Sequence, residues 1–202
     1  ERFDAAFVHF RHKHGSYWRW VRPVFDGSSA ADASARIEFR PLPGQPTLSD
    51  TIALVAAVAG LLTGLSIGDH PATDLPWTVA RENFYAAVED GLSADLEWIT
   101  ASGDRVSETR QLYEDLFDVA VSGLEARGLT TAEATDRIQP LRDRVAAGIT
   151  PAKWKREVVR RRLDAGESPA DAVRDAQRAY IGEQGEQFYD GSLVDWIGGY
   201  TA

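Results

Sequence analysis

The chain has 202 residues, of which 44% are hydrophobic, enough to build a substantial globular core. Its formal net charge is −9, and this acidic balance argues against the whole molecule being a general binder of nucleic acid. Because the chain contains no cysteine, it has no disulfide framework, no thiolate metal site and no cysteine nucleophile.

A pair of histidines, His12 and His14, lies near the start of the chain. In an extended segment both rings would share a face, where they could bind a transition metal or, when charged, an anion. No third ligand follows at a suitable spacing. We therefore expect a loop or the rim of a binding site here, and not a metal centre.

Two strand-like segments follow, at about residues 17–25 and 35–42. The first carries Arg22 among bulky aromatic residues that include Trp18, and the second ends at a proline-rich turn. Together they predict a pair of short antiparallel strands near the start of the chain.

Charged side chains share one face of the second strand. Because side chains alternate along a strand, Arg36, Glu38 and Arg40 point one way, while Ile37 and Phe39 point the other. An ordinary surface strand gives the same alternation, and this alternative stays open. Two such strands side by side would build a charged sheet face.

The longest apolar segment, residues 51–67, approaches the length of a membrane span. Gly60 and Gly64 interrupt it, Gly68 follows it, and Asp50 and Asp69 flank its ends, which leaves a weak membrane candidate. We expect a buried helix, capped at Thr47 or Ser49 and covered on several sides. The expected location of the protein is cytoplasmic, without membrane association.

From residue 73 onward the chain reads almost entirely as helices, so the predicted fold class is α+β and predominantly helical. Thr73 or Asp74 is expected to head the first of these helices, which stops at Gly91. Ser107 is expected to head the next, which ends at Gly128.

Further helix starts follow in the last third of the chain. Thr130 and Glu133 match a capping box. Cap-plus-proline pairs predict two helices at 151–165 and 169–182, which resemble an αα-hairpin. We expect the tail, residues 188–197, to dock as a short segment.

One dense basic run lies in the helix expected at residues 151–165. Its charges wrap widely around the helix axis, which favours a solvated helix paired with neighbouring acids. The alternative is phosphate-backbone contact by a helical nucleic-acid-binding module, which would need no enzyme. The run consists of Lys153, Lys155, Arg156, Arg160, Arg161 and Arg162.

A series of short motifs follows the chain in a fixed order. They are Gly15-Ser16-Tyr17-Trp18, Val21-Arg22-Pro23, Ile37-Glu38-Phe39-Arg40, Thr47 with Asp50, Arg81-Glu82-Asn83 and Gly91-Leu92. This order resembles the C-terminal half of the glutamate-cysteine ligase and carboxylate-amine ligase superfamily, from about Gly15 to Leu96. The family fold is similar to that of glutamine synthetase, in which a curved antiparallel sheet holds magnesium ions and ATP, with helices packed outside.

The resemblance implies an ATP-dependent ligase, and within the superfamily a glutamate-cysteine ligase. ATP would phosphorylate the γ-carboxylate of glutamate, and the amine of cysteine would then displace phosphate to give γ-glutamylcysteine. The family pattern implies Glu38 as a Mg²⁺ ligand and Arg40 as the catalytic residue that also contacts ATP. It implies Arg22 and Trp18 as residues that bind the amino-acid substrate.

The family's N-terminal half, with its further metal ligands, does not stand in this sequence. We therefore expect residues 1–202 to be a single domain that forms the C-terminal part of a larger catalytic domain, inactive without that half. The acceptor amine and the oligomeric state are not predicted. A non-enzymatic helical interaction or nucleic-acid-binding module is the alternative function.

Overall fold

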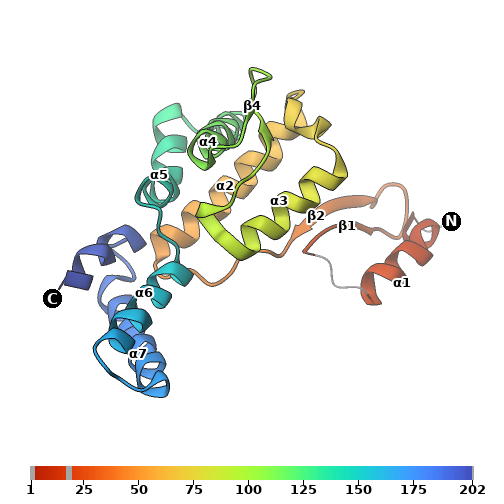
Figure 1. The fold of residues 1–202 in the computed structure, drawn as a ribbon. Coiled ribbons are helices and arrows are strands. Elements are labelled where there is room, and N and C mark those ends of the chain that lie inside the picture. The colour runs from red at the N-terminus through yellow and green to blue at the C-terminus, as the bar shows by residue number, and fades with distance from the viewer. Residues whose placement is uncertain (1–2, 17–19, 202) are drawn as a thin grey trace. The chain divides into compact units, whose positions relative to one another are not determined.

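A computed structural model describes residues 3–16 and 20–201 (Figure 1). The fold is α+β and predominantly helical, which confirms the predicted class. Its described strands form two separate antiparallel pairs. The chain divides into two compact units, residues 1–44 and 45–202, and each is described by itself. That residues 1–202 belong to one larger catalytic domain stays a prediction.

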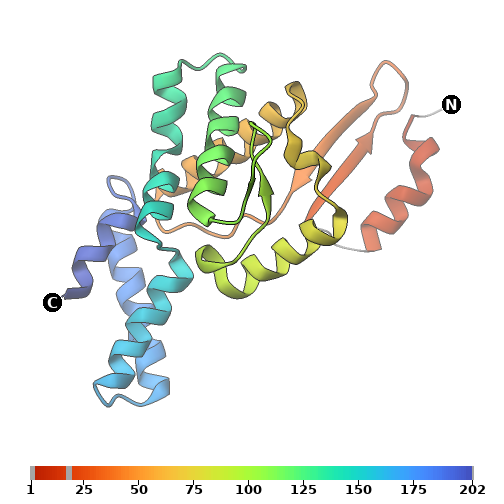
Figure 2. The ribbon, with the colours of Figure 1, turned by 45° about the horizontal axis from the view of Figure 1, so that its top comes forward.

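The first unit contains the predicted strand pair, drawn in orange in Figure 2. Strand β1 (Val21–Asp26) pairs antiparallel with β2 (Ser34–Phe39), which confirms the two strands with shorter bounds. β2 ends before Pro41 because a proline has no N–H to donate to a ladder. The loop between the strands begins at Gly27, whose φ of 130° is a conformation that side chains rarely adopt.

The segment before the strands is helical, so a loop around His12 is wrong, and the alternative, the rim of a binding site, stays a prediction. A 3₁₀ turn (Phe3–Phe7) leads into helix α1 (Val8–Ser16). Aromatic contacts hold these elements against β1: Phe7 stacks on Phe25 with ring centroids 4.4 Å apart, and Phe10 lies 5.5 Å from the same ring. These contacts join distant residues, so local sequence patterns do not reveal them.

The second unit is helical apart from one small strand pair. Its helices are α2 (Leu48–Ile67), α3 (Trp77–Asp90), α4 (Thr109–Glu125), α5 (Thr131–Ala147), α6 (Pro151–Asp164) and α7 (Pro169–Gln187). Its 3₁₀ turns are η2 (Pro71–Asp74), η3 (Gly91–Ser93) and η4 (Leu193–Thr201). Strands β3 (Trp98–Ile99) and β4 (Arg105–Val106) form the antiparallel pair, which the sequence did not predict.

Most helix starts that rest on a capping side chain are confirmed. The Thr47 side chain accepts the N–H of Asp50 at the start of α2, and Thr130 and Glu133 complete the capping box of α5. Thr150 caps α6 in the same way. Helix α7 continues past its predicted end at residue 182, because a glycine inside a helix costs only about 1 kcal/mol.

Two predicted helix starts are wrong. Thr73 and Asp74 belong to the 3₁₀ turn η2, and α3 begins after Pro76 with no capping side chain. Ser107 does not head α4, which begins at Thr109. The strand pair β3–β4 takes up the residues just before this start, and the Thr109 hydroxyl donates to the carbonyl of Ala94.

The core of the second unit lies where α2 crosses α4 and α5 (Figure 1). Buried residues of this core include Ala57 of α2, Phe117 of α4 and Ile138 of α5. The backbones of α2 and α4 approach closely, because a Cβ on Gly123 would lie 1.8 Å from the carbonyl oxygen of Gly60. Glycine is therefore required at this crossing.

Helix α2 is buried on one face only. Ile52 and Val55 are 39% and 53% exposed, so the expectation of cover on several sides is wrong. Contacts with α4 and α5 account for the buried face. Of the described helices, α2 alone is long and apolar enough to cross a membrane, judged by length and composition only.

A second core holds the end of the chain against the α6–α7 hairpin. The rings of Trp154, Tyr180 and Trp196 meet edge to face, with centroids 5.1–5.8 Å apart. Leu193 and Trp196 are almost fully buried, so the predicted docking of the tail is confirmed.

Candidate functional site

One carboxylate between two guanidinium groups forms the centre of the charged face of the hairpin made by β1 and β2. Arg22 Nε lies 2.5 Å from Glu38 Oε2, while Arg40 Nε and Nη2 lie 2.8 and 2.6 Å from Glu38 Oε1. Each oxygen of Glu38 therefore has its own arginine. The three side chains are partly buried, with about 18–30% of their surfaces exposed.

Strand register explains why these residues meet. Arg22 lies directly opposite Glu38 in the β1–β2 pairing, and Arg40 follows Glu38 by two residues on the same side. The backbone N–H of Arg40 donates to the carbonyl of Trp20 at 2.7 Å, which keeps the alignment just beyond the last residue of β2. The predicted charged face is thus built from both strands.

The arginines also set the protonation of the carboxylate. The hydrogen bond from Arg22, followed by that from Arg40, lowers the pKa of Glu38 below its ordinary value. Partial desolvation acts in the opposite direction and is weaker. Glu38 therefore stays ionised under all conditions near neutral pH.

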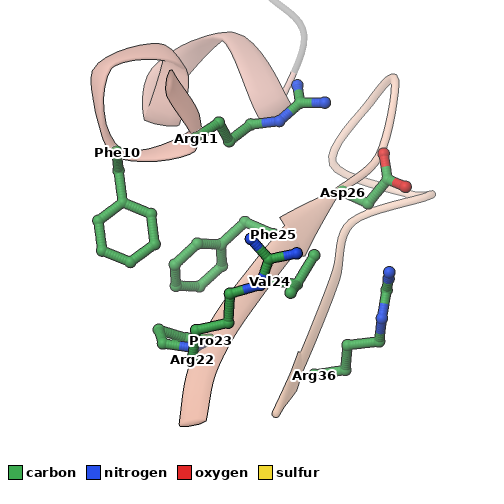
Figure 3. Close-up of a pocket in the computed structure, with 8 residues that line it drawn as sticks. All are labelled: Phe10, Arg11, Arg22, Pro23, Val24, Phe25, Asp26 and Arg36. Atoms are coloured by element: carbon green, nitrogen blue, oxygen red, sulfur yellow. The ribbon is translucent and has the colours of Figure 1, made fainter. Parts of the chain in front are cut away.

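A pocket of about 310 Å³ lies beside this cluster, between α1 and the strands (Figure 3). Figure 3 shows Phe10 and Phe25 on one side of the pocket and charged side chains from α1, β1 and β2 around the rest. Arg22 belongs both to the Glu38 cluster and to this pocket. The complete lining is Phe10, Arg11, Arg22, Pro23, Val24, Phe25, Asp26 and Arg36.

Such an arrangement suits an anionic ligand. Guanidinium groups bind carboxylate and phosphate through several N–H donors in a fixed fork, so one arginine can contact Glu38 and a ligand oxygen together. Glu38 holds the two forks in place before a ligand arrives.

The sequence model of glutamate-cysteine ligase family 2 (GCS2) matches residues 4–190. The chain belongs to this family. No curated protein and no solved structure gives a significant match. The match to the GCS2 family includes the hairpin and nearly all of the helical unit, which confirms the resemblance drawn from the motifs.

Glu38, on the β1–β2 hairpin, is the predicted ligand of Mg²⁺. A carboxylate is the right donor for Mg²⁺, but both oxygens of Glu38 are already held by arginines. Within residues 3–16 and 20–201, no group of three or more acidic or histidine side chains is placed to hold a metal ion. The described residues alone therefore do not make a magnesium site.

Two other predicted elements have different outcomes. Trp18, the expected substrate-binding aromatic, lies outside the described residues. In the Arg81-Glu82-Asn83 motif, Asn83 has a structural role: its amide donates to the carbonyl of Glu97 at 2.7 Å and accepts the N–H of Glu97 at 2.9 Å. Arg81 lies 5.2 Å from the ring centre of Tyr85 on the same helix.

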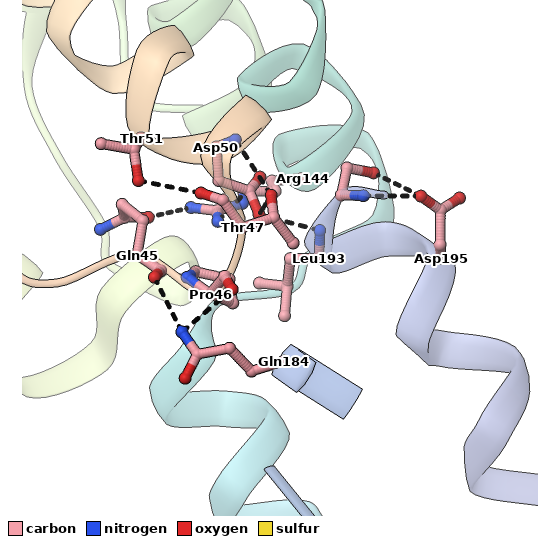
Figure 4. A network of polar contacts seen from close by, with 10 residues as sticks. Gln45, Pro46, Thr47, Asp50, Thr51, Arg144, Gln184, Leu193 and Asp195 are labelled. Atoms are coloured by element: carbon pink, nitrogen blue, oxygen red, sulfur yellow. Dashed lines mark hydrogen bonds and ion pairs between the residues drawn. The ribbon is translucent and has the colours of Figure 1, made fainter. Parts of the chain in front are cut away.

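The Thr47 and Asp50 motif is also structural (Figure 4). Asp50 is fully buried and pairs with Arg144, and its second oxygen accepts from the Thr47 hydroxyl at 2.8 Å and from the N–H of Leu193 at 3.0 Å. The Arg144 guanidinium also donates to Gln45 at 2.8 Å. These bonds join the start of α2 to α5 and to the tail.

Asp115 of α4 is a partly buried carboxylate that was not predicted from the sequence. It accepts hydrogen bonds from His70 Nε2 at 3.1 Å, from Trp98 Nε1 at 2.7 Å and from the N–H of Ala101 at 2.8 Å. The N–H of Ala72 donates to His70 Nδ1, so the ring proton is on Nε2. Each group is satisfied within the fold, and we assign this cluster to structure.

Some basic side chains of α6 pair with neighbouring acids, as predicted for a solvated helix. Lys153 lies 3.9 Å from Glu157, and Arg162 lies 3.0 Å from Glu167. Lys155 Nζ lies 3.9 Å from the ring centre of Tyr180. Whether α6 contacts nucleic acid stays a prediction.

Arg11 and Asp26, neither of which was predicted from the sequence, also line the pocket next to the Glu38 cluster. A signal for Asp26 was present, because it lies on the same strand face as Arg22, four residues away. Arg11 had no such signal, since its place depends on the unpredicted helix α1.

Proposed function

We propose that this chain supplies part of the active site of an ATP-dependent carboxylate-amine ligase that joins glutamate to cysteine. The observation that carries the proposal is the pair Arg22 and Arg40 held on the two oxygens of Glu38. Membership of the GCS2 family supports the reaction class. The substrates, the ATP requirement and a cytoplasmic location are parts of this proposal.

The reaction needs positive charge at two points. In the first step the γ-carboxylate oxygen of glutamate attacks the terminal phosphorus of ATP, and ADP leaves. In the second step the cysteine amine attacks the carbonyl carbon of the acyl phosphate, phosphate leaves with the electron pair of the broken C–O bond, and the attacking nitrogen loses a proton to water. Both steps concentrate negative charge on phosphoryl oxygens, which fixed donors stabilise in the transition state.

The arginines provide these donors in the proposal. Arg40 contacts the phosphoryl group in transfer, and Arg22 holds the substrate carboxylate beside it. Glu38 is a positioning residue for both guanidinium groups. Its further role as a ligand of Mg²⁺ needs carboxylates from outside the described residues, and no step here depends on it.

The test uses the full-length protein with glutamate, ATP and a panel of amine acceptors that includes cysteine. Product is identified by mass spectrometry, and phosphate release gives the rate. We expect Arg40→Lys to lower kcat by on the order of 100-fold, with a smaller change in KM, because lysine keeps the charge but loses the planar fork.

Glu38→Gln should also lower the rate, and partial rescue by added magnesium would support metal binding by Glu38. Arg160→Lys, an exposed change on α6, is the matched control and should leave kcat unaltered. A folded Arg40→Lys variant with wild-type kcat would rule out the assigned site. Absence of ligation with every acceptor would rule out the reaction.

A further inference from the structure

The pocket between α1 and the strands has a charge opposite to that of the chain. Three arginines and one aspartate line it, whereas the whole chain has a net charge of −9. Phe10 and Phe25 give it an apolar wall. Such a pocket fits a small organic molecule that carries more negative than positive charge.

Of the arginines that line this pocket, Glu38 holds Arg22 but not Arg36. The Arg36 side chain is exposed and has no hydrogen bond or ion pair with any described residue. It lies on the same face of β2 as Glu38, two residues away, a separation of about 7 Å along the strand. A ligand with one acidic group at Arg22 and Arg40 can therefore place a second acidic group at Arg36.

Asp26 supplies the opposite charge at the same end of the pocket. It is the last residue of β1 and pairs with Ser34, so it is diagonal to Arg36 across the two strands, with Cα atoms roughly 7–8 Å apart. One of its oxygens accepts the N–H of Gly27 at 2.9 Å, which fixes the carboxylate in place. Figure 3 shows Asp26 and Arg36 on the same side of the pocket.

We propose that this pocket binds the α-amino-acid head group of the acid substrate, with Arg36 on the α-carboxylate and Asp26 on the ammonium group. The inference rests on the proposed function and names its specificity-determining residues. The remote carboxylate of a dicarboxylic amino acid then lies at Arg22 and Arg40, where the proposed phosphorylation occurs. An acid that lacks either head-group charge leaves Arg36 or Asp26 without its partner.

Binding can be measured without ATP or acceptor, by calorimetric titration of the full-length protein. The probes are L-glutamate, γ-aminobutyrate, which lacks the α-carboxylate, and glutarate, which lacks the ammonium group. Arg36→Gln should weaken glutamate binding by about 10- to 100-fold and leave γ-aminobutyrate binding unchanged. Asp26→Asn should weaken glutamate binding by a similar factor and leave glutarate binding unchanged.

Arg160→Gln is the matched control, because Arg160 is likewise exposed and without a partner among the described residues. Arg36→Lys keeps the charge without the fork and should show an intermediate loss, which also covers a failure of Arg36→Gln to fold. If the folded Arg36 variants bind glutamate as tightly as the wild type, the inference is wrong.

The two proposals fail separately. Glutamate binding that depends on Arg36 and Asp26, without ligation to any amine, would keep this inference and reject the proposed reaction. If the Arg36→Gln variant ligates amines and still prefers glutamate over γ-aminobutyrate as the wild type does, the proposed reaction is kept and this inference is rejected.

Discussion

Asp50 of α2 and Arg144 of α5 form a buried ion pair, with 2.9 Å between Oδ1 and Nη2. The Asp50 side chain is fully shielded from solvent, and only 10% of the Arg144 side chain is exposed. The second oxygen of Asp50 is satisfied by Thr47 and Leu193. Removal of the carboxylate would therefore leave a buried cation and two donors without their acceptor.

Asp50→Ala should lower the free energy of unfolding by about 3–5 kcal/mol, because breaking one side of a buried pair leaves the other charge uncompensated. Urea denaturation monitored by circular dichroism measures this loss. Asp136→Ala, an exposed change on α5, is the control and should alter stability by no more than about 0.5 kcal/mol. Equal effects of the two substitutions would contradict a stabilising role for the pair.

Gly123→Ala should destabilise the helical unit by about 1–3 kcal/mol or more, because the added methyl group meets the backbone of Gly60. Gly182→Ala on α7 is the matched control: no atom lies within 4 Å of its Cβ position, so this change should stabilise by about 1 kcal/mol. Thermal unfolding of both variants tests the opposite signs. A neutral Gly123→Ala would mean that α2 and α4 are free to move apart.

The pH dependence of the hairpin should follow Glu38. Because its pKa in the folded state is depressed, its pairing stabilises the hairpin above the ordinary glutamate pKa and is lost as the pH falls through the depressed value. Carbon-detected NMR titration of the Glu38 carboxyl group measures this pKa. We expect Arg22→Gln to raise it more than Arg40→Gln, since the Arg22 hydrogen bond is the largest cause. Identical titrations of the wild type and Arg22→Gln would refute the pairing.

Helix α6 should give no specific affinity for nucleic acid. The net charge of −9 opposes approach, and the basic side chains are spread around the helix. Fluorescence anisotropy with duplex DNA and RNA at physiological salt is expected to show no submicromolar binding. Such binding, if abolished by joint replacement of Arg160, Arg161 and Arg162 with alanine, would instead establish the nucleic-acid-binding alternative.

Local chemistry explains which parts of the fold were predictable. A capping side chain and the backbone N–H that donates to it are three positions apart, so Thr47, Thr130 and Thr150 could be identified from sequence alone. Helix α1 was missed because its support comes from the packing of Phe7 and Phe10 on another element. Tertiary contacts of this kind override weak local preferences.

In the candidate site, too, local contacts were predictable from the sequence and contacts between distant segments were not. Alternation along one strand predicted that Glu38 and Arg40 share a face, and their hydrogen bond confirms it. The contact of Glu38 with Arg22 depends on the register between two strands, which the connecting loop fixes and alternation alone does not. The roles of Thr47 and Asp50 were open for a similar reason, since their partners lie far along the chain.

The bond from the N–H of Leu193 to Asp50 spans 143 positions of the chain. During synthesis, α2 leaves the ribosome long before Leu193, whose N–H bonds to Asp50 in the first turn of α2. Helices α2, α4 and α5 can associate early, but the polar start of α2 reaches its final state only when the tail arrives. Closing so long a loop is slow compared with forming a helix, so the tail is expected to set the last step of folding for the helical unit.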